Sequence, residues 1–71
     1  MSFEGSCTDE IGHAAGKVWE TLSHSGPLSM TRLVKESGAP RDLVMQAVGW
    51  LAREDKVVIE DEGRSRVIRL R

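Results

Sequence analysis

The sequence has one cysteine, no tyrosine and only three aromatic residues among its 71 positions. A single cysteine excludes an internal disulfide framework. No apolar run approaches the ~20 residues that a membrane-spanning helix needs, and no signal-peptide pattern is present, so we expect a cytoplasmic protein without membrane partners. A chain of this length forms one small domain with a thin core and no deep pocket for a small-molecule substrate.

Metal and catalytic patterns are also missing. Zinc sites need closely spaced Cys and His pairs, but Cys7 precedes the first predicted helix, and His13 and His24 are far apart along it. We find no phosphate-binding glycine loop and no paired acidic site. The sequence therefore predicts a protein that is not an enzyme and needs neither metal nor cofactor.

The formal net charge is −1, with 10 basic and 11 acidic side chains. Nucleic-acid-binding domains usually carry a basic surface, and the total shows none. Residues 64–71 are an exception. They contain no acidic side chain and four arginines: Arg64, Arg66, Arg69 and Arg71. Two interpretations stay open: a solvated strand face, or a local edge that binds anions such as phosphate.

Residues 1–7 show no periodicity and are expected to be a disordered leader, followed by a single domain over residues 8–71. Thr8 is a candidate cap for a first helix that ends near Ser23–Ser25, where Gly26-Pro27 stops it. Its apolar stripe consists of Ile11, Ala15, Val18, Trp19 and Leu22.

Two glycines inside this helix need an explanation, because each costs about 1 kcal/mol relative to alanine. We expect Gly12 and Gly16 to allow close approach of a neighbouring element. The alternative is that Gly12 and Gly16 form a contact between two copies of the chain in a homodimer.

A second helix is predicted from Ser29, as its cap, to Ser37-Gly38, and a third from about Pro40 to Glu54. The third helix has an apolar face of Leu43, Val44, Ala47, Val48 and Leu51. Its opposite face carries Arg41, Asp42, Met45, Gln46, Gly49 and Arg53.

The pattern then changes to that of strands. Lys56–Glu60 and Arg66–Arg71 alternate around the turn Asp61–Arg64. With Glu62-Gly63 as a two-residue turn, Val57 pairs with Ile68, and Ile59 with Arg66. One face of this hairpin then carries the aliphatic residues Val57, Ile59, Ile68 and Leu70.

These elements predict an α+β fold, the winged helix-turn-helix, with three helices and a C-terminal two-stranded β-hairpin as the wing. Trp19 and Trp50 are expected to anchor the core, Trp50 between the third helix and the wing. On that basis Trp50→Ala should cost about 3 to 5 kcal/mol.

Two segments carry a family resemblance. Ile11–Trp19 resembles the first helix, and Val48–Lys56 the end of the third helix, of a small family of stand-alone bacterial and archaeal winged helix-turn-helix proteins of unknown function. Gly49-Trp50-Leu51-Ala52-Arg53-Glu54 is the most specific part. The resemblance implies a scaffold like those that bind DNA, and it assigns no functional residues.

The first functional hypothesis is DNA binding, as in a transcriptional regulator. In a winged helix the third helix enters the major groove and the wing touches the backbone or minor groove. The candidate contacts are Ser29, Thr31, Arg41, Gln46, Arg64 and Arg66. Three to five phosphate contacts give only weak, salt-dependent binding, and three nearby acids oppose it, namely Asp42, Asp61 and Glu62.

The alternative is a protein-interaction or dimerisation module. Met45 and Gly49 make the outer face of the third helix flatter and more apolar than a DNA reader requires, and Met adapts well to partner surfaces.

The sequence does not resemble the winged helices that bind left-handed DNA. Those place Lys, Asn and Tyr at four-residue spacing on the third helix, where this chain has Arg41, Met45 and Gly49.

Overall fold

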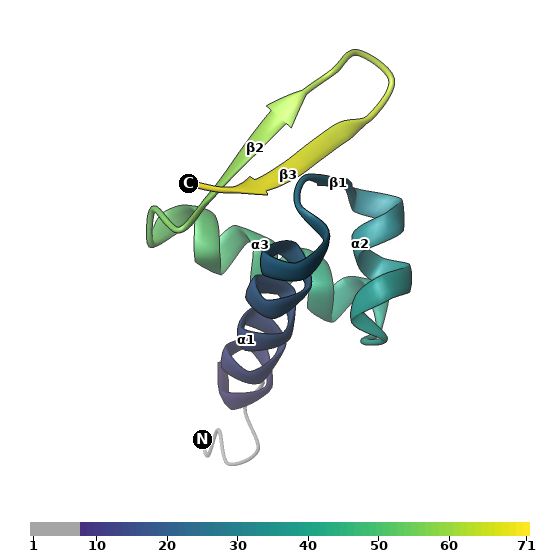
Figure 1. The fold of residues 1–71 in the computed structure, drawn as a ribbon. Helices are drawn as coiled ribbons and strands as arrows, with labels where there is room; N and C mark the ends of the chain where they lie inside the picture. The colour runs from purple at the N-terminus through teal and green to yellow at the C-terminus, as the bar shows by residue number, and fades with distance from the viewer. Residues whose placement is uncertain (1–7) are drawn as a thin grey trace.

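The computed structural model describes residues 8–71, so the predicted leader at residues 1–7 lies outside the described residues. Over residues 8–71 the elements follow the order α1 (Thr8–Ser25), β1 (Leu28–Ser29), α2 (Met30–Ser37), α3 (Arg41–Arg53), β2 (Val57–Asp61) and β3 (Arg66–Leu70) (Figure 1). The strands form one antiparallel sheet in the order β1-β3-β2. This arrangement confirms the predicted winged helix, with β1 as a third strand beside the hairpin.

Helix α1 ends where the sequence predicted. Gly26 adopts φ 77°, which favours glycine, and its N–H donates to the carbonyl oxygen of Leu22 at 2.9 Å. At the other end, Thr8 is the first described residue and is itself helical, so it is not the cap that the sequence predicted.

The connection between α2 and α3 also follows the sequence. Ser29 caps α2, where its hydroxyl oxygen accepts from the backbone N–H of Arg32 at 3.2 Å. Gly38 ends α2 with φ 73°. Pro40 then precedes α3, and its carbonyl oxygen accepts from the N–H of Val44 at 2.9 Å. These residues therefore mark the start of α2, its end, and the start of α3.

The core lies between the three helices and the inner face of the sheet. Its buried residues are Ala14, Ala15, Val18, Leu22, Leu33, Val44, Ala47, Val48, Leu51, Val57 and Ile68. The predicted apolar face of α3 therefore faces the core, with Leu43 half-buried at its margin. Along residues 8–71, no helix combines the length and the apolar character needed to cross a membrane.

The register of the hairpin differs from the prediction. Val57 pairs with Leu70, Ile59 with Ile68, and Asp61 with Arg66. The loop is longer than two residues because the carboxylate of Asp61 accepts from the N–H of Gly63 at 2.9 Å, and the N–H of Glu62 donates to the carbonyl of Ser65 at 2.8 Å. The shift is an even number of residues, so the four predicted aliphatic side chains still share one face.

The two tryptophans are not core anchors, and that prediction was wrong. Trp19 is 46% exposed and Trp50 is 45% exposed. Each lies about 100° around its helix from a buried neighbour, Val18 or Leu51, and so sits at the edge of the packed face. Aliphatic residues fill the thin core without them.

The expected close approach at Gly12 and Gly16 was also wrong. Both positions are exposed, and a Cβ atom added at either would meet nothing within 4 Å. No packing between the described elements requires glycine there. The homodimer contact at Gly12 and Gly16 stays a prediction.

Candidate nucleic-acid interface

A groove of about 350 Å³ separates the hairpin from the N-terminal ends of α2 and α3. Its lining residues are Ser29, Met30, Thr31, Arg41, Met45, Asp61, Gly63, Arg64, Ser65 and Arg66. Five of the six residues predicted to contact DNA therefore line one groove, although they come from three separate stretches of the chain. The sixth, Gln46, is exposed on α3 but does not line the groove.

The helix-turn-helix positions one wall of this groove. Ser29 and Thr31 stand at the start of α2, where unpaired backbone N–H groups and the helix dipole favour an anion. Arg41 is the first residue of α3, directly after Pro40, and Met45 follows one turn later on the same face. This wall therefore presents two hydroxyls, a guanidinium group and a thioether.

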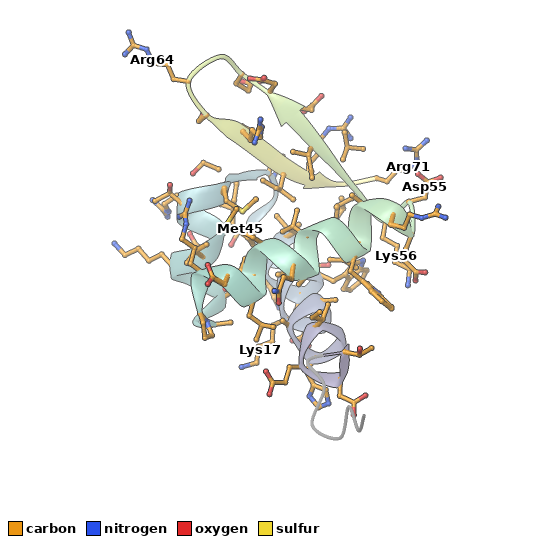
Figure 2. The ribbon with its side chains drawn as sticks, turned by 180° about the vertical axis from the view of Figure 1, so that it is seen from behind. Lys17, Met45, Asp55, Lys56, Arg64 and Arg71 are labelled. Carbon is orange, nitrogen blue, oxygen red and sulfur yellow. The ribbon has the colours of Figure 1, made fainter. Side chains whose placement is uncertain are left out.

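The wing supplies the opposite wall. Arg64 lies in the loop between β2 and β3, and its side chain points away from the body of the protein at the tip of the hairpin (Figure 2). Arg66 begins β3 opposite Asp61 in the pairing register. The hydrogen bond from Gly63 to Asp61 shapes the loop that carries these residues.

The arginines divide into a paired and an unpaired set. Arg32 pairs with Glu36 at 2.7 Å, Arg69 with Glu60 at 3.1 Å, and Arg71 with Asp55 at 3.4 Å. In the part of the chain that the structure describes, no ion pair involves Arg41, Arg64 or Arg66. Among residues 8–71, Arg53 at the far end of α3 has no ion pair either, so three of the four unpaired arginines line the groove. These three share the groove lining with one carboxylate, Asp61. The groove is locally basic although the whole chain is not.

The predicted interaction surface is only partly at the groove. Met45 lines it and is 46% exposed. Gly49 is exposed one turn further along α3, beyond the groove. Both residues therefore face outward on α3, as the sequence predicted, but only Met45 contributes to the groove lining.

A second hollow, of about 430 Å³, lies between α1 and the turn before α3. Its lining residues are Asp9, Glu10, His13, Ala14, Lys17, Gly38, Ala39, Pro40 and Leu43. Sequence reasoning missed it, because folding alone brings α1 against the Gly38–Pro40 turn. Its charged groups are of both signs, and no group of three metal-binding side chains exists among residues 8–71.

Comparison with protein families gives one match over almost the whole chain. The model of the winged helix-turn-helix domain family DUF2582 matches residues 7–70. Uncharacterized protein MJ1608 of Methanocaldococcus jannaschii is 34% identical over 65 residues, which cover 87% of this chain and 91% of that protein.

Solved structures share the fold. Protein BT2368 from Bacteroides thetaiotaomicron is 37% identical with a TM-score of 0.78, over 87% of this chain and 76% of that one. The Zalpha domain of Carassius auratus PKZ, solved in complex with Z-DNA, has a TM-score of 0.78 at 21% identity, over 87% and 98% of the two chains. Identity this low shows a shared winged-helix fold and nothing about the ligand of this chain.

Proposed function

The chain belongs to the winged helix-turn-helix family DUF2582, and from this premise we propose that it binds duplex DNA in the groove between α3 and the wing. The observation that carries the proposal is the gathering of Arg41, Arg64 and Arg66 around one groove, each without an ion pair along residues 8–71. Arginines that have no carboxylate partner are available to phosphate groups.

In the proposed complex, α3 lies in the major groove with its N-terminal half against the bases. Arg41, Arg64 and Arg66 contact phosphates on either side. Ser29 and Thr31 donate to a further phosphate at the start of α2, where backbone N–H groups point outward. Gln46, exposed on α3 outside the groove, is placed to contact an adenine edge.

The proposed ligand is ordinary right-handed DNA. The Zalpha domain in the comparison was solved with Z-DNA, but its likeness to this chain is one of fold. On α3 the positions at four-residue spacing are Arg41, Met45 and Gly49, which differ from the Lys, Asn and Tyr of left-handed-DNA binders. Met45 and Gly49 thus lack the polar side chains that such a complex uses at the second and third positions.

Binding should be weak and strongly dependent on salt. Three arginine contacts correspond to a slope of about −3 in a plot of log K against log salt concentration. Asp61 lines the groove and opposes phosphate, which lowers the affinity further. A non-enzymatic transcriptional regulator that binds as more than one copy fits this weak single-domain affinity.

Titration of a fluorescently labelled duplex at low and at physiological salt tests the proposal. The double variant Arg41→Ala/Arg66→Ala should lower the affinity at least tenfold at low salt and flatten the salt dependence. The matched control is Arg53→Ala, which removes an exposed arginine about 18 Å away at the other end of α3. The control removes one arginine and the double variant removes two, so the losses are compared for each arginine removed. An equal loss for each arginine, or no binding at low salt, would overturn the proposal.

A protein-interaction role is the second candidate, favoured by the exposed apolar side chains of Met45, Trp19 and Trp50. Backbone amide spectra recorded over a range of protein concentrations test it. Shifts around Gly12, Gly16 or Met45 that grow with concentration, together with no response to DNA, would favour self-association over DNA binding.

A further inference from the structure

Met45 is an apolar side chain in an otherwise polar groove. It is 46% exposed, and most of its neighbours in the groove lining carry hydroxyl, guanidinium or carboxylate groups. Met30 also lines the groove, but it packs against the hydrophobic core. Met45 lies outside that core cluster and outside the residues packed against it, as far as residues 8–71 show. Core packing therefore does not account for a methionine at this position.

Phosphate binding does not account for it either. A groove that contacts only phosphates gains nothing from a thioether, because a sulfur between two carbons is at most a weak acceptor and donates no hydrogen bond. An exposed apolar side chain in the lining of a binding groove gains free energy only by covering apolar surface of the ligand. The ligand should therefore have an apolar feature that α3 reaches.

Duplex DNA offers one such feature in the major groove. Base edges there present hydrogen-bond donors and acceptors, and the C5-methyl group of thymine is the apolar element among them. We propose that Met45 covers this methyl group, so that the protein prefers thymine over an otherwise identical base without the methyl. This inference rests on the proposed DNA binding and adds a base preference to it.

The neighbours of Met45 on α3 suit this contact. Arg41 lies one turn earlier on the same face and is available to the adjacent phosphate. Gly49 lies one turn later, where a Cβ atom would meet nothing within 4 Å of the protein. Without a side chain at Gly49, the DNA backbone and bases can approach α3 closely enough for Met45 to reach the base edge.

The test compares a short mixed-sequence duplex with the same duplex in which uracil replaces every thymine. The two differ only in the C5-methyl groups. The wild-type protein should bind the thymine duplex about fourfold more tightly for each methyl group that it covers. Met45→Gln keeps a side chain of similar length and should bind both duplexes equally. Gln46→Ala, the matched control on the neighbouring exposed position, should weaken binding but keep the thymine preference.

The outcomes separate this inference from the proposed function. Equal affinity of the wild type for both duplexes, with the arginine and salt dependence intact, overturns the methyl contact and leaves DNA binding standing. A thymine preference that survives in Met45→Gln also overturns it, because the preference would then come from DNA shape. No binding to either duplex at low salt overturns both.

Discussion

The hydroxyl of Ser25, the last residue of α1, donates a hydrogen bond of 2.9 Å to the carboxylate of Glu36 near the end of α2. The other oxygen of this carboxylate accepts from Nε and Nη2 of Arg32, at 3.2 Å and 2.7 Å. One carboxylate thus links two helices that are joined in sequence only through β1. The hydrogen bonds from Arg32, and secondly from Ser25, hold the pKa of Glu36 below its ordinary value of 4.5.

Glu36→Gln should destabilise the protein at neutral pH and have little effect in acid. A folded-state pKa below the unfolded value means that the charged carboxylate stabilises the fold above pH 4.5, and that this contribution disappears as the pH falls through the folded pKa. Thermal unfolding at neutral pH and at about pH 3 measures the difference. Glu20→Gln, on the exposed face of α1, is the control. A stability difference that stays constant across this pH range would contradict the role of the charge.

The elements of the fold could be predicted because capping residues and periodicity determine them locally. Ser29, Gly26 and Gly38 end or begin helices as expected. The hairpin register could not be predicted, since it depends on how the Asp61 carboxylate folds the loop by accepting from Gly63. The predicted two-residue turn did not include this hydrogen bond. An Asp two residues before a Gly is nevertheless a recognised signal for a turn in which the Asp side chain accepts from the backbone.

The site was predictable in outline and not in its electrostatics. The helix-turn-helix geometry indicated Ser29 and Arg41, and both line the groove. The sequence showed four C-terminal arginines as one group, but folding pairs Arg69 with Glu60 and Arg71 with Asp55. These pairings depend on distances across the hairpin and to the turn after α3, which no local pattern contains.

Trp50→Ala should destabilise the protein less than the sequence alone suggested. With 45% of its surface exposed, Trp50 contributes about half of the free energy that full burial gives, so we expect a loss of about 1.5 to 2.5 kcal/mol. Leu33→Ala is the comparison, because Leu33 is fully buried at 0% exposure and its truncation should cost about 2 to 5 kcal/mol. Urea unfolding of the two variants gives the ranking. A larger loss for Trp50→Ala would show that the indole is packed more tightly than its exposure implies.

Gly49→Ala should stabilise the protein by up to about 1 kcal/mol. Alanine favours the helix, and its Cβ would meet nothing within 4 Å. Gly38→Ala should instead destabilise by about 1 to 2 kcal/mol, because Gly38 adopts φ 73° in the left-handed region. Chemical denaturation of both variants provides the test. Destabilisation by Gly49→Ala would mean that a Cβ atom at position 49 clashes with neighbouring atoms.

Asp61→Asn should raise the affinity for duplex DNA. Asp61 is the carboxylate that lines the groove beside Arg64 and Arg66, and it repels any phosphate bound there. Asparagine keeps a side-chain oxygen that can accept from Gly63, so the loop retains its shape. Removing one negative charge about 6 Å from a phosphate should tighten binding roughly threefold at low salt, with the gain shrinking as salt screens the interaction.

Asp55→Asn is the matched control for this charge change. Asp55 pairs with Arg71 at the end of the hairpin opposite the tip, far from Arg64 (Figure 2). Its substitution removes the same charge from the protein and releases an arginine, yet it should leave the affinity nearly unchanged. If both variants tighten binding equally, the gain reflects net charge alone. In that case DNA does not lie in the groove between α3 and the wing, since only a bound phosphate near Asp61 makes the two carboxylates differ.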